Sequence, residues 1–373
     1  MKPLDMVLQE FNKARNKAEL LGAWPFSDLD TYDKYYKNTD IVRGYVKLWE
    51  SLCAKYGYND PFTYHYGADV VFLRCKGDIP VTYDNPIPIF VKEIDYDAFQ
   101  YYKLDSVELE LDFDKCPCLF VGGLFTLAPS SLNTVKLKIR CFTRDSLCLD
   151  NLFEGTKVSE IYIEELAVGS LTDLRLRCTF SSPHISKLDF QSVYVNSYIS
   201  NSTNIFAKTR CFIDASWLHE DLFDVIKGVN GTIDASSCSI DISVADEYCE
   251  TLVSEVEKNG CTLIAPYSLK QYESALGSRI MITEQKSNSC VDVKGLARDE
   301  LQLYKDFKNR VSYPNVYDVE RLIFEWTKLC YKYNYKDPLV YTLEDDDDPA
   351  FVMAEAGYTN VQVDNNIVIP HFA

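Results

Sequence analysis

The chain has 373 residues, of which 47% are hydrophobic and 13% aromatic, so it can build folded cores and is not a disordered tail. Its formal net charge of −18 and its pI near 4.7 oppose binding to nucleic-acid phosphates and to anionic membrane surfaces. We therefore expect protein partners rather than nucleic acid or membrane, although an acidic surface also serves simply to keep a protein soluble.

Residues 1–31 are predicted to form an N-terminal helical segment. This segment has no apolar region of the kind that a signal peptide needs, and no stretch of the chain reaches the length of an apolar membrane helix. Most of the 13 cysteines lie inside apolar runs, where a free thiol packs as a small hydrophobic side chain. We expect a cytoplasmic protein, or one located within a virion if it derives from a phage.

A short segment occurs twice, near the two ends of the chain. Residues 49–64 and 326–341 match without a gap at an offset of 277, and nine of the sixteen positions are identical. Looser similarity continues downstream, where 69–72 aligns with 348–351 and 83–89 with 363–369. We interpret residues 32–95 and 301–373 as two copies of one small α+β module, rather than as convergent helix–turn segments.

Each copy is predicted to begin with an amphipathic helix, because hydrophobic residues recur at helical spacing along 40–56 and 318–333. An Asp-Pro pair then ends each helix, and two short strands follow. The expected module core is Trp49, Leu52, Cys53, Trp326, Leu329 and Cys330. The surrounding tyrosines exceed what a small core needs, and exposed tyrosine is enriched at protein interfaces. The tyrosines predicted to lie on an interaction surface are Tyr58, Tyr64, Tyr66, Tyr335 and Tyr341.

Residues 104–266 contain short alternating runs that predict β-strands, spaced about 26 residues apart. The central residues of these runs are Leu109, Leu137, Ile161, Leu188, Ile213, Ile233 and Leu263. Apolar pairs precede many of them, namely Leu124–Phe125, Leu152–Phe153, Ile205–Phe206 and Leu222–Phe223. A strand, a turn, an apolar back element and a second turn make up the unit of a solenoid, in which each unit buries its hydrophobic edge against its neighbours.

This pattern resembles leucine-rich repeats, in particular the irregular BspA-like type of bacterial and phage proteins. Residues 151–163, in which a Leu-Phe-Glu-Gly turn precedes the strand Ile-Tyr-Ile, are typical of that type. The resemblance implies a right-handed coil with a parallel sheet along one face and a surface that binds proteins. The predicted fold is α/β: a short leucine-rich-repeat-like solenoid flanked by the two small α+β modules. A β-sandwich or an α+β domain with seven strands is the rival interpretation.

Residues 267–300 are assigned to a connector, and no pattern in the chain identifies an enzyme. The four histidines, His65, His184, His219 and His371, lie in none of the usual metal-binding or catalytic motifs. Cys116-Pro-Cys118 lacks a second cysteine pair at zinc-binding spacing. The acidic run 344–348 lacks the alternating ligands of a calcium loop and predicts a solvated loop. We predict no catalytic residue, no cofactor and no metal.

The resulting hypothesis is a non-enzymatic interaction, structural or assembly protein, of bacterial or phage type, that uses a solenoid face and duplicated docking modules. Because the two ends of a solenoid differ chemically, one module cannot cap both through the same contacts. The copies are better explained as two attachment points for similar partners, or as units that pack on each other. The alternatives are an acidic inhibitor that mimics nucleic acid and an enzyme with an unrecognised site. The sequence leaves an oligomer open.

Overall fold

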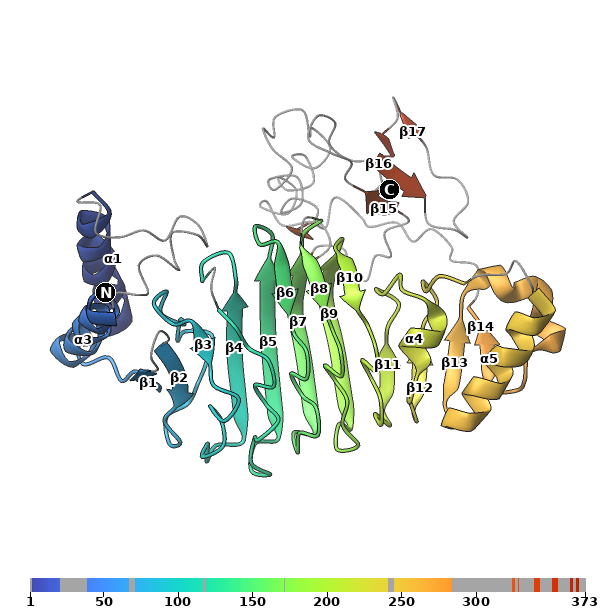
Figure 1. Cartoon of the computed structure of the whole chain (residues 1–373), viewed down its shortest axis with the longest axis horizontal. Helices are drawn as coiled ribbons and strands as arrows, with labels where there is room; N and C mark the ends of the chain where they lie inside the picture. The colour runs from blue at the N-terminus through green and yellow to red at the C-terminus, as the bar shows by residue number, and fades with distance from the viewer. Residues whose placement is uncertain are drawn as a thin grey trace, which may run out of the picture.

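The computed structural model describes residues 2–20, 39–66, 71–116, 119–170, 172–240 and 245–283, and the shorter pieces 324–325, 328, 339–342, 351–354, 363–364 and 367–368. The fold is α/β, and most of the described strand pairs are parallel. Figure 1 shows the strands standing side by side in one long row, with two helices at the N-terminal end and one long helix at the other.

The N-terminal end of the row is built from α1 (Pro3–Leu20), α3 (Thr39–Tyr56) and a small sheet. The two helices pack through aromatic side chains, and the ring of Phe11 meets that of Trp49 edge-on with centroids 5.3 Å apart. β1 (Phe62–Tyr66) and β2 (Val71–Cys75) then form an antiparallel hairpin, and β3 (Glu93–Ile94) pairs with β2 in parallel. The predicted helix and two strands of the first module are therefore present.

The central sheet contains four parallel strands, β4 (Ser106–Asp112), β5 (Thr134–Cys141), β7 (Glu160–Val168) and β9 (Lys187–Val195), in that order. Alternate side chains point inward, so that Leu109, Leu137, Ile163 and Phe190 form one buried row in register. We expected Ile161 and Leu188 in this row, but they belong to the neighbouring row, in which Ile161 pairs with Val135 and with Leu188. Period-two hydrophobicity predicts the strands well, and their register less well.

Two further parallel sheets are present, of which one lies alongside the central sheet and the other continues the row beyond β9 (Figure 1). β6 (Ser146–Cys148), β8 (Asp173–Arg175) and β10 (Tyr198–Asn201) form one of them, in the order β10-β8-β6. β11 (Phe212–Asp214), β12 (Thr232–Asp234), β13 (Thr262–Ala265) and β14 (Ile280–Ile282) form the other. The strands β6, β8 and β10 were not predicted, because three or four residues carry too little of an alternating pattern.

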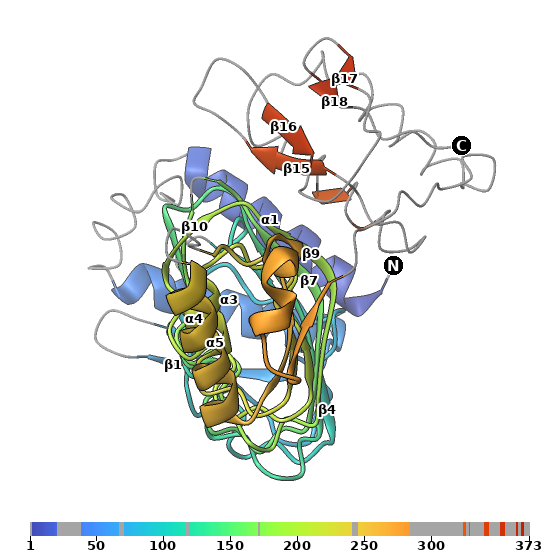
Figure 2. The same cartoon turned by 90° about the vertical axis from the view of Figure 1, so that its right-hand side faces the viewer.

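Helices accompany the last sheet. They are α4 (Leu222–Ile226), α5 (Ala245–Asn259) and the 3₁₀ helix η1 (Tyr267–Ala275). Viewed from the end of the row, α4 and α5 lie on one side and the strands of the central sheet on the other (Figure 2). Because β14 adds a strand to the sheet beyond Pro266 and η1 precedes it, the described part of residues 267–300 is not the plain connector that we expected.

A ladder of stacked phenylalanines runs through the core, parallel to the row of strands. Its members are Phe99, Phe125, Phe153, Phe180 and Phe206, and neighbouring ring centroids are 4.7 to 5.8 Å apart. Successive ladder phenylalanines are 26 to 28 residues apart in the sequence, so each passage of the chain through the core adds one ring to the ladder. Phe223, expected at an equivalent position, instead lies in α4 against Tyr248.

Left-handed backbone conformations mark the turn that leads into the ladder. Two residues before a ladder phenylalanine, Gly123, Asn151, Cys178 and Asn204 all have a φ between 54° and 71°. This conformation is easiest for glycine and tolerable for asparagine, so Gly and Asn at this point help to set the turn. The expected pairs Leu124–Phe125, Leu152–Phe153 and Ile205–Phe206 follow directly, and Thr179–Phe180 takes the same place without an aliphatic residue.

Near the C-terminus, the described pieces include two antiparallel hairpins, visible above the central sheet in Figure 1. One pairs β15 (Leu339–Thr342) with β16 (Phe351–Ala354), and the other pairs β17 (Val363–Asp364) with β18 (Ile367–Val368). In the first hairpin Tyr341 faces Val352, and in the N-terminal hairpin Tyr64 faces Leu73. Residues 324, 325 and 328 are helical.

Candidate functional site

The outer face of the central sheet carries rows of charged side chains. β4 contributes acidic side chains to it, β5 contributes basic ones, and β7 contributes acidic ones again, because every second residue of a strand points outward. A bulge after Ile163 interrupts this alternation in β7 and turns both Glu164 and Glu165 outward. The outward residues of the first three strands that carry charge are Glu108, Glu110, Asp112, Lys136, Lys138, Arg140, Glu160, Glu164 and Glu165. We call this surface the charged sheet face.

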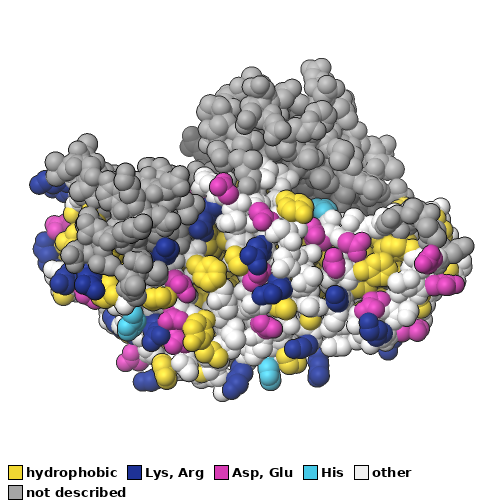
Figure 3. All heavy atoms as spheres, viewed as in Figure 1, with side chains coloured by type: hydrophobic (Ala, Val, Ile, Leu, Met, Phe, Trp, Pro, Cys, Tyr) yellow, Lys and Arg dark blue, Asp and Glu magenta, His cyan; other side chains and the backbone are white. Residues whose placement is uncertain are grey.

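Ion pairs join the strands across the charged sheet face. Lys136 Nζ lies 2.9 Å from Glu108, and Lys138 Nζ lies 3.8 Å from Glu164. On the far side, Lys187 of β9 donates to the Tyr162 hydroxyl at 3.1 Å. Pairs of this kind between half-exposed side chains add little stability, which leaves the charges available to a partner. Basic and acidic side chains are also interspersed over the side seen in Figure 3, so that side is not a surface of one sign.

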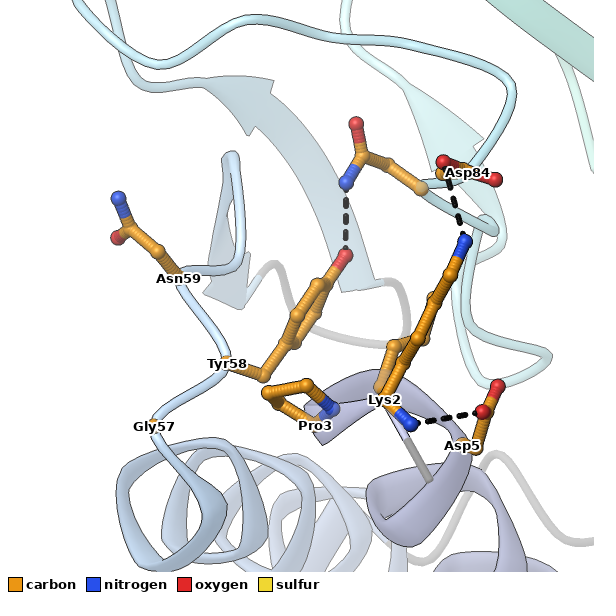
Figure 4. Close-up of a pocket in the computed structure, with 9 residues that line it drawn as sticks. Lys2, Pro3, Asp5, Gly57, Tyr58, Asn59 and Asp84 are labelled. Carbon is orange, nitrogen blue, oxygen red and sulfur yellow. Dashed lines mark hydrogen bonds and ion pairs between the residues drawn. The ribbon is translucent and has the colours of Figure 1, made fainter.

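A pocket of about 280 Å³ opens where the start of α1 meets the loop after α3. Figure 4 shows Tyr58, Lys2 and Asp84 around it. The Tyr58 hydroxyl accepts a hydrogen bond from Asn85 at 2.9 Å, and burial raises the pKa of Tyr58 to about 12. Lys2 Nζ lies 3.8 Å from Asp84, and its backbone nitrogen donates to Asp5 at 3.0 Å. The charged groups pair with one another, so a ligand would have to displace these contacts.

The predicted module core residues of the first copy, Trp49, Leu52 and Cys53, are all buried. The indole of Trp49 donates to the buried carboxylate of Asp60 at 2.7 Å, and the hydroxyl of Tyr64 donates to the same oxygen at 2.7 Å. Asp60, which we predicted only to end the helix, therefore accepts hydrogen bonds from two buried side chains. The sequence contained a sign of this role, since Trp, Asp and Tyr are all among the identities shared with the second copy.

The three predicted interaction tyrosines that the structure describes, Tyr58, Tyr64 and Tyr66, differ in their exposure. Tyr64 is 8% exposed, so its expected place on the surface is wrong: its ring packs on Phe90 and its hydroxyl needs Asp60. Tyr58 is half-buried, whereas Tyr66 is 43% exposed and lies under the guanidinium of Arg43. In the second copy, the predicted interaction residue Tyr335 and the side chain of Tyr341 lie outside the described residues. The predicted core residues Trp326, Leu329 and Cys330 also lie outside them.

The remaining candidates for chemistry are dispersed or shielded. His65 lies on β1, His184 precedes β9 and His219 precedes α4, while His371 lies outside the described residues. Burial raises the pKa of the Cys53 thiol to about 12 and that of Cys141 to about 11, which suppresses their reactive thiolates.

Within the described ranges, no group of three or more His, Cys, Asp or Glu side chains is placed to hold a metal ion. No helix among those residues has the length and apolar character needed to cross a membrane. No protein-family model, no curated protein and no solved structure matches the chain.

Proposed function

We propose that the chain is a non-enzymatic interaction or assembly protein, built as a leucine-rich-repeat-like solenoid with a copy of one small module near each end. The charged sheet face is the observation on which this function depends. It is a broad surface of long, oppositely charged side chains held on a rigid parallel sheet, and such surfaces favour specific contact with another protein. The resemblance to bacterial and phage repeat proteins supports a cytoplasmic or virion location.

The repeated core supports the solenoid part of the proposal. The phenylalanine ladder, the left-handed residues before it and the parallel strands recur together with each passage of the chain. The turns repeat as well. Asp214 accepts hydrogen bonds from the backbone and hydroxyl of Ser216, and Asp234 accepts one from the backbone of Ser236. Each unit thus makes equivalent contacts with the next, as expected of a repeat protein.

The two hairpins support the duplication. When 62–65 is aligned with 339–342 and 72–75 with 351–354, every pair of facing residues in β15 and β16 corresponds to a facing pair in β1 and β2. The helical residues 324, 325 and 328 align with positions inside α3. The same strand register and the same order of elements favour common ancestry over convergence.

A capture experiment with the full chain tests the function. Wild-type protein and a Lys136→Glu/Lys187→Glu variant are used as baits in extract of the native host, and stoichiometric partners are identified by mass spectrometry and then titrated as purified proteins. The expected result is a partner whose affinity falls at least tenfold with the variant. A Lys270→Glu/Arg279→Glu variant changes the net charge equally, away from the charged sheet face, and is expected to bind like wild type. Equal binding by all three baits would contradict the proposal.

A further inference from the structure

Three outward-facing residues of the central sheet are buried outside its continuous core. They are Phe142, directly after β5, Ala167 of β7 and Tyr194 of β9, which are 2%, 0% and 7% exposed. Ala167 pairs with Arg140 and with Tyr194 in register, whereas the neighbouring Leu166 points into the core. Side chains on this outer face are covered only if another part of the chain lies over them.

Phe324 is a covering residue. It is 2% exposed, and its ring lies 6.1 Å from that of Phe142, which in turn stacks on Tyr194 with centroids 6.4 Å apart. A phenylalanine buried to this extent stabilises the contact through the apolar area that it removes from water. The four side chains therefore form a second, smaller hydrophobic cluster on the outer face.

An ion pair accompanies the aromatic contact. Lys328 stands one helical turn after Phe324, and its Nζ lies 2.9 Å from Glu165 Oε1. The other oxygen of Glu165 accepts from Arg140 Nε at 2.8 Å. The carboxylate is only 8% exposed, and buried ion pairs of this kind favour one geometry because a misplaced partner leaves an unpaired charge.

The two module copies differ at these positions. At the offset of 277 residues, Phe324 aligns with Lys47 and Lys328 aligns with Ser51, both of which are exposed on α3. The first copy folds its helix without an aromatic residue at the first place and without a cation at the second, so the fold of the module does not require either feature where the second copy has it. Their role in the second copy is contact with the sheet.

We propose that Phe142, Ala167, Tyr194, Glu165 and Arg140 form an anchor site for a protein helix that carries an aromatic residue and, four positions later, a lysine. The chain's own Phe324 and Lys328 fill this anchor site in cis. A partner helix of the same chemistry binds by displacing them. This inference rests on the proposed role of the sheet as a protein-binding surface, and it adds the recognition rule and the intramolecular competitor.

A labelled synthetic peptide of residues 318–333 tests the anchor site by fluorescence anisotropy. The full chain carrying Phe324→Ala and Lys328→Ala is expected to bind this peptide at least tenfold more tightly than wild type, because the anchor site has lost its internal occupant. A peptide of residues 41–56, which has lysine and serine at the two anchor positions, is the matched control and is expected not to bind. Circular dichroism spectra of wild type and variant check that the fold is retained.

Adding Phe142→Ala and Glu165→Gln to the double variant is expected to abolish binding of the 318–333 peptide. Equal affinity of wild type and double variant, or equal binding of both peptides, would overturn the anchor site. Hydrogen exchange gives a second measurement, since Phe324→Ala is expected to increase exchange around residues 324–328 while β5 stays protected. None of these results depends on Lys136 or Lys187, so failure here is distinguishable from failure of the capture experiment.

Discussion

The side chain of Asp60 accepts hydrogen bonds from several buried donors. Its carboxylate accepts from the indole of Trp49, the hydroxyl of Tyr64 and the backbone nitrogen of Phe62. Desolvation raises the pKa of Tyr64 well above its ordinary value, so the phenol stays protonated and keeps donating. This network gives a physical reason for three of the identities shared by the two copies, since Trp326, Asp337 and Tyr341 repeat the same residue types.

Replacing Asp60 with alanine leaves the Trp49 and Tyr64 donors unpaired in the core. We expect Asp60→Ala to lower the free energy of unfolding by about 3 kcal/mol, measured by urea denaturation followed by tryptophan fluorescence. Asn59→Ala is the control, because Asn59 is the exposed neighbour in the chain and its loss is expected to change stability by less than about 0.5 kcal/mol. Equal effects of the two substitutions would show that the network contributes nothing.

The buried thiols permit a second prediction. Since burial raises the pKa of Cys53 to about 12, only about one molecule in 10⁴ carries the thiolate at pH 8. We expect Cys53 to resist iodoacetamide in the folded protein and Cys178, which is half-buried, to react faster. Peptide mass spectrometry after timed alkylation measures both sites in one sample, and urea-unfolded protein serves as the reference for full reactivity. Comparable rates at the two sites in the folded protein would contradict the prediction.

At the scale of elements, the phenylalanine ladder is the part of the core that repeats. Phe153 is fully buried and stacks on Phe125 at 4.7 Å and on Phe180 at 5.8 Å, so its removal opens a cavity between neighbouring passages of the chain. We expect Phe153→Ala to lower the free energy of unfolding by about 3–5 kcal/mol and Phe153→Leu by less. Phe223→Ala, which lies outside the ladder, is expected to have a smaller effect in the same urea titration. A loss at Phe153 no larger than at Phe223 would mean that the ladder is not a principal source of stability.

Sequence patterns predict those elements whose own residues carry the signal. Alternating runs identify β4, β5, β7 and β9, and the stripe of apolar residues identifies α3. The pair Thr179–Phe180 was missed because threonine is not aliphatic, although Thr179 is fully buried and its hydroxyl donates to the carbonyl of Leu149. Leu222–Phe223 was included wrongly, because two apolar residues in a row also suit a short helix.

Longer-range features escape prediction for a different reason. β14 gains its place from pairing with β13, and nothing within residues 267–283 alone specifies that partner. The anchor site is likewise invisible in the sequence, because Phe142, Tyr194 and Phe324 come together only through the register of β7 and β9 and the approach of a distant helix. Tyr64 was wrongly predicted to lie on the surface, because Asp60 was considered only as the residue that ends the helix and not as a hydrogen-bond acceptor.

At the scale of the whole molecule, the charge on Glu165 couples the sheet to the C-terminal helix. Burial alone would raise the pKa of Glu165, but the hydrogen bonds and charges of Lys328 and Arg140 outweigh it and lower the pKa below its ordinary value of 4.5. The other charged groups nearby are Glu164 on the same strand, Glu110 beside Arg140 and Glu325 beside Lys328. A lowered pKa means that docking favours the ionised carboxylate.

Docking of the helix should therefore depend on pH. The contribution of Glu165 is fully present above its ordinary pKa of 4.5 and is lost as the pH falls through the lower pKa of the docked state. We expect amide hydrogen exchange around Phe324, corrected for intrinsic rates, to rise between about pH 5 and pH 3 while exchange in β5 changes little. In Glu165→Gln the neutral amide cannot titrate, so exchange around Phe324 is expected to be faster at pH 6 and to show no such rise. The same rise in wild type and in the variant would assign the coupling to another group.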